Sequence, residues 1–474
     1  MSKIWKLFIC ENIKTWKKLS TKILIIVILI ALIGSLAIVK IAEKASESNQ
    51  TIADSMVDDG KLFLEEAIKN IEEALQNENL DEQTREANER QLQTYKLSLK
   101  YNVSPYKTSW KSEAIEKIID SETEMATKIE KILGNDDFTQ YIEIQKQEAK
   151  EEFDNGIIGE QEYKDQITIL ELKEKYEIGK NEDAPYWRTA LLTQIKNAQT
   201  SLRTGIDTNN YNKKVLTVER QQELEESILM NIYRLEHNIP SIEYTQNFRT
   251  IYEYLAPTFV VAVIAITAMV MAGSAISTEI SSGSIKFWAL TPNKRWKILT
   301  AKILSILFYI IVITLVMAIL TIILGNIFFD TQAETYLFVK DGNVVELGNA
   351  VYLISLYFAK LIPVFIFALF ALMLSVLTRN TAVAVSFSVA IYIGNTIAMA
   401  IINQFITKDW IRFVPFNNLN IADKIFPNAS NPISFATDGF ATSTSLGFSL
   451  AVLGVCAILM LVTMYDSFNR RDII

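Results

Sequence analysis

Six apolar runs, each about as long as the helix that crosses the hydrocarbon core of a bilayer, restrict this chain more than any other feature. They are Ile23–Ala42, Pro257–Ile276, Ile303–Gly325, Tyr352–Leu377, Ala382–Ile402 and Leu446–Tyr465. Because backbone polar groups must be satisfied inside the lipid, apolar runs of this length predict helices. We therefore expect an all-α membrane protein with six transmembrane helices.

The first run has a second interpretation as a cleaved signal peptide, because a lysine-rich leader precedes it. The apolar part of a signal peptide is usually about 7–15 residues long and ends at a small-residue cleavage site. The run 23–42 is longer and has no clean site of this kind, so an uncleaved membrane anchor is favoured.

Lysine and arginine gather at every second connection between the runs. Basic residues near a span are retained on the cytoplasmic side, so this pattern predicts that both termini are cytoplasmic. The residues are six lysines before the first run, then Lys286, Lys294, Arg295, Lys297, Arg379, Arg470 and Arg471. The predicted segments are an amphipathic cytoplasmic helix at 1–22, the first span at 23–42, an extracellular domain at 43–256, the second span at 257–276, a cytoplasmic segment at 277–302, spans three to six within 303–465 with extracellular loops 327–351 and 403–445, and a cytoplasmic tail at 466–474.

The large connection between the first two spans has the composition of a water-exposed domain. Residues 43–255 hold 43 acidic and 26 basic side chains, a net charge of −17, whereas the rest of the chain carries +9. Apolar residues recur there at helical spacing without strand-like alternation, which predicts an elongated bundle or coiled-coil stalk of roughly five to seven helices. Asn155, Gly156 and Gly159 predict the turn of an αα-hairpin. The acidity has two interpretations, simple solubility or a surface that repels or collects cationic peptides and ions.

The leader before the first span has one apolar face. Trp5, Phe8, Ile9, Ile13 and Trp16 share that face, and lysines occupy most of the remainder. This pattern is typical of an amphipathic helix that lies among lipid headgroups, so membrane lipid is a predicted partner. An unstructured basic leader that only sets topology is the alternative.

Signatures of catalysis are missing from the sequence. It contains no G-x-x-x-x-G-K-[ST] loop, no G-x-S-x-G elbow and no H-E-x-x-H helix. The single histidine, His237, has no companion nucleophile, and two distant cysteines, Cys10 and Cys456, exclude a Cys/His metal centre. We expect neither an enzyme nor a bound metal or cofactor in this chain, and we expect no nucleic acid partner.

The cytoplasmic segment after the second span has the character of a docking element. Apolar residues stand among small and basic ones, Pro292 favours a turn at Thr291, and basic residues open the next helix at the membrane surface. Glu279 lies near its beginning, where a carboxylate can pair with basic groups of a partner, although a solvated charge at a helix end is the alternative. Pro292 in the same way can be a plain turn former.

A family resemblance rests on this segment. Glu279, Gly283, Leu290, Pro292, Arg295 and Lys302 resemble the E-x-x-x-G … L-x-x-P … R … K signature of the permease subunits of type-2 ABC transporters. The six spans, the cytoplasmic termini and the interfacial leader are similar to the family pattern as well. Ser284 replaces a usual threonine, and only a subset of the family has a large extracellular domain between the first two spans.

The resemblance implies a function. It identifies the chain as the membrane-spanning permease subunit of an ATP-driven exporter in the cytoplasmic membrane of a bacterium. A second permease subunit, identical or related, would complete the pathway. A separate cytoplasmic P-loop ATPase, which holds ATP and Mg, would dock on the coupling segment, where the coupling residues are Glu279, Gly283, Leu290, Pro292 and Arg295. The alternative is a non-transporting assembly that transmits ATPase motion to the extracellular domain.

Two polar residues inside the spans are candidates for the pathway or the subunit interface. Lys360, followed by Pro363, predicts a bend in the fourth span. Asn395 in the fifth span predicts a hydrogen bond between helices. No acid is expected at the midplane, so an ion gradient is a poor energy source. The prolines and phenylalanines of 403–445 predict short external or re-entrant helices.

Overall fold

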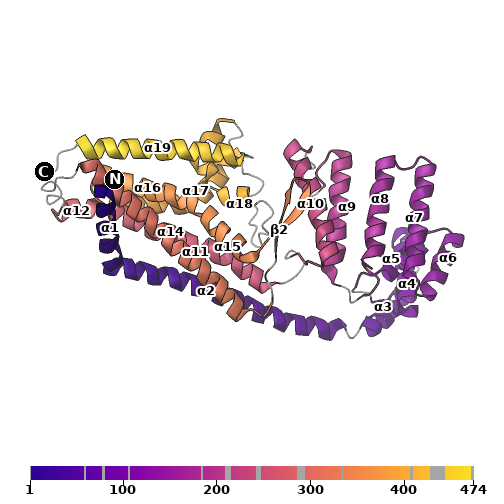
Figure 1. The fold of residues 1–474 in the computed structure, drawn as a ribbon. Coiled ribbons are helices and arrows are strands. Elements are labelled where there is room, and N and C mark those ends of the chain that lie inside the picture. Colours follow the sequence, from indigo (N-terminus) through magenta and orange to yellow (C-terminus); the bar gives the residue numbers. More distant parts are fainter. Residues whose placement is uncertain are drawn as a thin grey trace. The chain divides into compact units, whose positions relative to one another are not determined.

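The fold comes from a computed structural model that describes residues 2–57, 60–76, 81–104, 107–182, 185–208, 215–241, 247–284, 294–331, 333, 335–405, 409–426 and 444–470. The chain divides into two compact units (Figure 1). Unit 1 comprises 1–42, 247–336 and 347–474, and unit 2 comprises 43–246 and 337–346.

Unit 1 contains the apolar helices. Their bounds are α1 Ser2–Lys17, α2 Leu19–Val57, α11 Phe248–Ser274, α12 Ser277–Ser281, α14 Arg295–Phe328, α15 Asn349–Ala359, α16 Leu361–Thr378, α17 Thr381–Phe405 and α19 Leu446–Arg470. Five described segments are long and apolar enough to cross a membrane, namely Leu19–Ser46, Phe248–Ser281, Arg295–Phe328, Asn349–Thr378 and Leu446–Arg470, whereas α17 offers the shorter apolar stretch Thr381–Asn395. The protein is therefore a multi-pass membrane protein.

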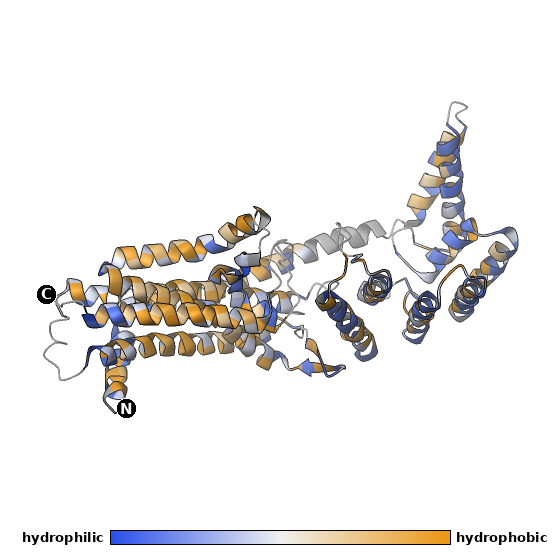
Figure 2. Cartoon of the chain, turned by 90° about the horizontal axis from the view of Figure 1, so that it is seen from above, coloured by the Kyte–Doolittle hydropathy of each residue, from blue (hydrophilic) through white to orange (hydrophobic). Residues whose placement is uncertain are grey.

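Helix α11 occupies the centre of unit 1, where it packs against α14, α16 and α17. It begins at Phe248, before the expected start of the second span, and holds Pro257 inside the helix. The approach to α17 is close at Gly273, because a Cβ atom there would lie 2.8 Å from Val385 Cγ2. Apolar side chains on the outside, such as Ile30 and Val455, stay exposed, and Figure 2 shows these helices hydrophobic along most of their length.

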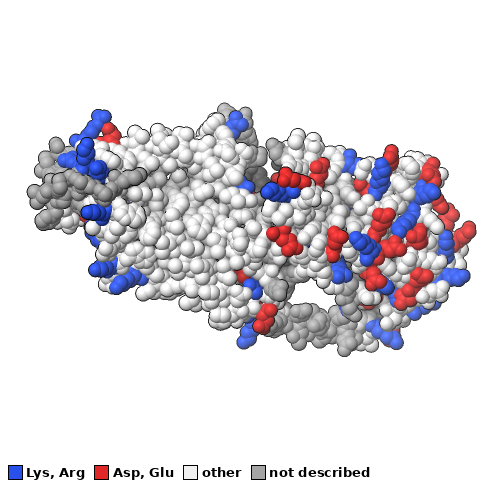
Figure 3. Space-filling model, viewed as in Figure 1, with Lys and Arg blue, Asp and Glu red and all other residues white. Residues whose placement is uncertain are grey.

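The start of α14 and the end of α19 contact each other in unit 1. The Arg295 guanidinium, at the start of α14, donates a hydrogen bond to the Asn469 carbonyl, near the end of α19, over 3.4 Å. One turn deeper, the hydroxyls of Thr300 and Tyr465 lie 2.7 Å apart. Figure 3 shows Lys and Arg gathered at this end of unit 1, with uncharged residues along its flank. The beginning of α14 and the end of α19 thus lie at one end of the unit.

The predicted bend in the fourth span is confirmed. The span is interrupted at Lys360, which ends α15 and precedes α16. Short helices follow α17 as expected, with η1 at Asp409–Phe413, η2 at Pro415–Asn418 and α18 at Ile421–Ile425. The prolines at 427 and 432, part of the same expectation, lie outside the described residues.

Unit 2 is a series of antiparallel helices, each packed on the next in the chain. Their bounds are α3 Gly60–Leu75, α4 Glu82–Lys100, α5 Trp110–Asp120, α6 Thr123–Gly134, α7 Phe138–Asp154, α8 Glu160–Lys175, α9 Tyr186–Thr204 and α10 Val218–His237. The described part of the unit thus has eight helices, so the expected five to seven is wrong. One cause is Ser121, whose extended backbone divides an apolar stripe between α5 and α6.

The αα-hairpin predicted at residues 155–159 is confirmed. Helix α7 ends before Asn155, Gly156 adopts a φ of +73°, and Gly159 is the N-cap of α8. A positive φ carries no steric cost for glycine, which explains its use in this turn. The rings of Phe153 and Tyr163 stack across the turn, with their centroids 5.1 Å apart.

A β-hairpin corrects the all-α expectation within the loop 327–351. Strands β1 Tyr336–Lys340 and β2 Asn343–Leu347 pair in a two-stranded sheet. Asp341 and Gly342 join them with φ angles of 51° and 76°. Asp-Gly between apolar β-branched residues is a strong hairpin signal, and the helical periodicity of the flanking spans concealed it. The Tyr233 hydroxyl donates a hydrogen bond to Glu346 of this hairpin over 3.2 Å.

Candidate coupling site

Helix α12 connects three neighbouring helices at the end of unit 1 where α14 begins. It follows directly after α11, and its first residue, Ser277, is fully buried. The Ser277 amide donates to Ser375 Oγ of α16 over 3.1 Å, and its hydroxyl lies 2.7 Å from Thr381 Oγ1 of α17. Helix α12 is therefore held against the ends of α16 and α17.

Glu279 of α12 is the centre of a buried ion-pair network. Its side chain is 8% exposed, and Oε1 lies 2.8 Å from the Nζ atom of Lys302 in α14. Lys302 is 3% exposed and also lies 3.1 Å from Oε2 of Glu11 in α1. Lys14, one turn after Glu11, forms a second ion pair with Glu279. We call Glu11, Lys14, Glu279 and Lys302 the coupling network.

The coupling network contains two acids and two bases, of which Glu11, Glu279 and Lys302 are buried and Lys14 is partly exposed. Loss of one partner of a buried ion pair leaves an uncompensated charge and costs about 3–5 kcal/mol. Burial alone would lower the pKa of Lys14, but hydrogen bonding and attraction from Glu279, with Glu11 further away, raise it above the usual 10.5. Lys14 therefore stays charged, and a solvated, unpaired Glu279 is excluded.

Packing of α1 on α14 positions Glu11 and Lys14. The Phe8 ring meets Phe308 edge-on at 5.7 Å between centroids, and Trp16 meets Tyr309 at 5.6 Å. Other apolar residues of the same helix, Trp5, Ile9 and Ile13, remain exposed. The amphipathic helix predicted for the leader is thus present, and its apolar residues are divided between α14 and the outside.

The other predicted coupling residues are only partly placed. Gly283 follows α12 with a φ of +70° and no atom within 4 Å of an added Cβ, so backbone conformation is its requirement. Arg295 opens α14 and contacts the end of α19 through the Asn469 carbonyl. Leu290 and Pro292 lie outside the described residues.

Lys360 and Asn395 stand apart from the coupling network. Lys360 is half-buried, and its ammonium donates to Thr258 Oγ1 over 3.2 Å and lies 5.7 Å from the Tyr254 ring centroid. Asn395 in α17 has a buried Oδ1 atom without a partner among the described residues. The predicted interhelical hydrogen bond of Asn395 is thus not seen at Oδ1 in the described part of the chain.

A second buried carboxylate lies at the opposite end of α11. Glu253 is 4% exposed, with Oε1 3.1 Å from Arg249 Nε and Oε2 2.8 Å from Asn349 Nδ2 of α15. The sequence placed it in the extracellular domain as one acid among many. In the sequence, an acid and a base four positions apart directly before an apolar run, here Arg249 and Glu253, indicate such a buried ion pair.

Sequence reasoning also missed Glu11 and Lys14. Glu11 is the lone acidic residue in the first 42 residues, which otherwise carry lysines, and such an exception marks a candidate ion-pair partner. Among the residues that the structure describes, no three His, Cys, Asp or Glu side chains form a group that could hold a metal ion.

The long apolar helices define a multi-pass membrane protein, and the coupling network joins α1, α12 and α14 at one end of unit 1. The model of the ABC-2 family transporter protein matches residues 19–473, so the chain belongs to the ABC-2 family of transporter membrane proteins. Two relatives from Bacillus subtilis are similar to it. The uncharacterized protein YhcI is 29% identical over 52% of this chain and 76% of its own length. The uncharacterized membrane protein YdbK is 28% identical over 43% of this chain and 76% of its own length.

Proposed function

We propose that this chain is the permease subunit of an ATP-driven ABC exporter, which pairs with a second permease subunit and docks a separate cytoplasmic ATPase on residues 277–302. Membership of the ABC-2 family supports a transporter. The coupling network carries the proposal further, because it joins the expected docking segment to two other helices through buried charges.

The arrangement in the membrane follows from the ends of unit 1. The start of α14 lies beside the end of α19, and α1 contacts α12, so both termini belong to one end and the number of crossings is even. Five segments satisfy the criteria for a span, and α17, packed on α11 and α16, supplies the sixth. The basic residues at this end favour the cytoplasmic side, which assigns unit 2 to the outside.

Motion of the ATPase reaches the spans through α12 in this proposal. ATP, bound with Mg on the partner, supplies the energy when the two ATPase copies close. A push on α12 is transmitted to α16 and α17 by Ser277 and to α14 by the pair of Glu279 with Lys302. Because buried ion pairs break only at high cost, α12 and α14 move together.

A reconstitution tests this role of Glu279. The chain and its ATPase are placed in inverted vesicles, and uptake of peptides, lipids and drugs is measured after ATP addition. Glu279→Gln keeps the shape of the side chain but removes the charge, so insertion and ATPase binding persist while ATP-driven uptake falls at least about fivefold, the lower end of typical coupling energies. Glu124→Gln, the same substitution at an exposed position of α6 outside the docking segment, is the matched control and leaves uptake unchanged.

Full uptake by Glu279→Gln would remove this residue from the coupling role. If the complex hydrolyses ATP but moves no substrate of the panel, a non-transporting assembly replaces the exporter. Absence of any P-loop ATPase bound to the chain would contradict both functions.

A further inference from the structure

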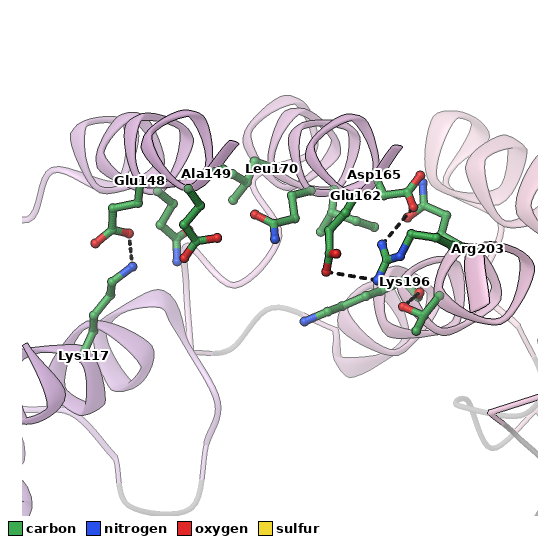
Figure 4. A pocket seen from close by; sticks show the side chains of 14 residues that line it. Lys117, Glu148, Ala149, Glu162, Asp165, Leu170, Lys196 and Arg203 are labelled. Carbon is green, nitrogen blue, oxygen red and sulfur yellow. Dashed lines mark hydrogen bonds and ion pairs between the residues drawn. The ribbon is translucent and has the colours of Figure 1, made fainter. Parts of the chain in front are cut away.

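Unit 2 holds a cavity of about 400 Å³ that no part of the coupling network touches. Helices α7, α8 and α9 supply most of its lining, and Lys117 of α5 borders one side (Figure 4). The volume lies within the range of about 300–1,000 Å³ that is typical of small-ligand pockets. The cavity therefore has room for a ligand the size of a short peptide.

Two sets of ion pairs border the cavity. On one side Lys117 pairs with Glu148, and on the other Arg203 lies 3.1 Å from Glu162 and 3.2 Å from Asp165. Figure 4 shows Lys196 extending into the space between these sets. The first set is neutral and the second carries one excess negative charge, and both connect neighbouring helices of the lining.

Unsatisfied acceptors lie in that lining. The Oε1 atoms of Gln145 in α7 and Gln199 in α9 are buried and have no hydrogen-bond partner in the described part of the chain. Gln145 uses its amide nitrogen for the Tyr141 hydroxyl, 3.3 Å away, which orients the oxygen elsewhere. A buried acceptor without a donor costs free energy, and a ligand rich in N–H groups would satisfy both oxygens.

Two charged groups of the lining are available to a ligand. Neither Glu152 nor Lys196 forms an ion pair with a described residue, although both line the cavity. Glu152 can pair with a cation, and Lys196 can donate hydrogen bonds to a carbonyl or carboxylate oxygen. A polyamine lacks the acceptor that Lys196 requires, whereas a peptide with a basic side chain offers both.

The spacing of these groups fits a few peptide residues. Gln145 and Glu152 lie two turns apart on α7, or about 10.5 Å at 1.5 Å per residue. Three residues of extended chain span about 10 Å. The net charge of −17 on residues 43–255 attracts cationic rather than anionic peptides over longer distances.

We propose that this cavity binds a short peptide segment that carries a lysine or arginine side chain. The basic side chain pairs with Glu152, backbone N–H groups donate to Gln145 and Gln199, and a carbonyl or terminal carboxylate accepts from Lys196. The site stands on unit 2 alone and does not depend on transport or on an ATPase.

Calorimetry on the full chain in nanodiscs at low ionic strength tests the site, with the tripeptide Gly-Arg-Gly as the probe and Gly-Glu-Gly and Gly-Gly-Gly as comparisons. The arginine peptide binds, and at least about tenfold more tightly than the acidic one, since charge-assisted hydrogen bonds are the strong ones. Glu152→Gln weakens its binding about tenfold. Glu151→Gln, at the exposed neighbouring position outside the lining, is the matched control with unchanged affinity.

Hydrogen exchange on the unsubstituted protein gives a readout that no folding defect can imitate. The arginine peptide slows amide exchange in α7 and α9 and leaves α3 and α4 unchanged. Equal affinity for the three peptides, an equal effect of the Glu151 and Glu152 substitutions, absent binding or protection outside the cavity would each overturn the proposal.

Discussion

Glu11 and Lys302 lie 3.1 Å apart as a buried ion pair although 291 positions separate them in the chain. Glu11 belongs to the leader helix α1, and Lys302 belongs to α14 and also pairs with Glu279 of α12. The leader therefore contributes Glu11 and Lys14 to the ion pairs of the coupling network.

The first prediction concerns the energy of this pair. Lys302→Met leaves the carboxylates of Glu11 and Glu279 buried with less compensation, so it lowers the free energy of unfolding by about 3–5 kcal/mol. Glu11→Gln in the same chain recovers part of the loss, which a double-mutant cycle in detergent measures through chemical unfolding. Lys294→Met, at an exposed position, changes little. Additive effects of the Glu11 and Lys302 substitutions would refute the pairing.

Natural cysteines provide a test of the orientation. Cys10 is exposed on α1, and Cys456 lies in α19. In a Cys456→Ser chain, a membrane-impermeant maleimide labels Cys10 in inverted vesicles and not in intact cells, because α1 is assigned to the cytoplasmic face. In a second chain, which also carries Cys10→Ser, Glu151→Cys at an exposed position of α7 reacts with the maleimide in intact cells. The opposite labelling of either site contradicts the topology.

Gly273 controls how closely α11 approaches α17. A Cβ atom added there would lie 2.8 Å from Val385 Cγ2 and 3.3 Å from the backbone nitrogen of Val385. The backbone of α11 or α17 must therefore move to accommodate a side chain. Gly273→Val therefore costs about 1–3 kcal/mol, the usual range for overpacking, and lowers the unfolding temperature in detergent. Gly34→Val in α2, where nothing lies within 4 Å, is the control. Equal effects of both substitutions would show that the contact is unimportant.

Acid sensitivity of unit 2 is predicted from Glu130. Hydrogen bonds from Lys100, 2.8 Å away, and Tyr101, 3.1 Å away, hold the pKa of Glu130 below its usual 4.5. A lowered folded-state pKa means that the stabilisation is present above pH 4.5 and is lost as pH falls through the folded-state pKa. Hydrogen exchange in α4 and α6 therefore accelerates below pH 4.5.

Glu130→Gln gives the matched comparison for that titration. It removes the carboxylate, so exchange in α4 and α6 is faster at neutral pH and its acceleration below pH 4.5 is smaller. Glu124→Gln, at an exposed position of α6, leaves the pH profile as in the original chain. An unchanged profile with Glu130→Gln would assign the acid response to other groups.

Four features of the fold depend on residues that are close together in the sequence. Two of them were predicted and two were missed. The αα-hairpin at Gly156 and the break at Lys360 follow from residues within a few positions of one another. The break at Ser121 and the Asp341-Gly342 turn are equally local. The break at Ser121 was missed because the helical periodicity of apolar residues continues across it. The Asp341-Gly342 turn was missed because long apolar helices precede and follow it.

The sequence by itself determined that the chain enters the membrane, that its large polar domain is helical and that Glu279 and Lys302 belong to a family signature. These properties depend on run length, periodicity and spacing, which are present in any conformation of the chain. Tertiary structure alone decided that Glu11 meets Lys302, that Glu253 is buried at the end of α11, and that Gln145 and Gln199 share one cavity. Such contacts join residues on separate helices, so packing decides them, and no local pattern records which helix faces which.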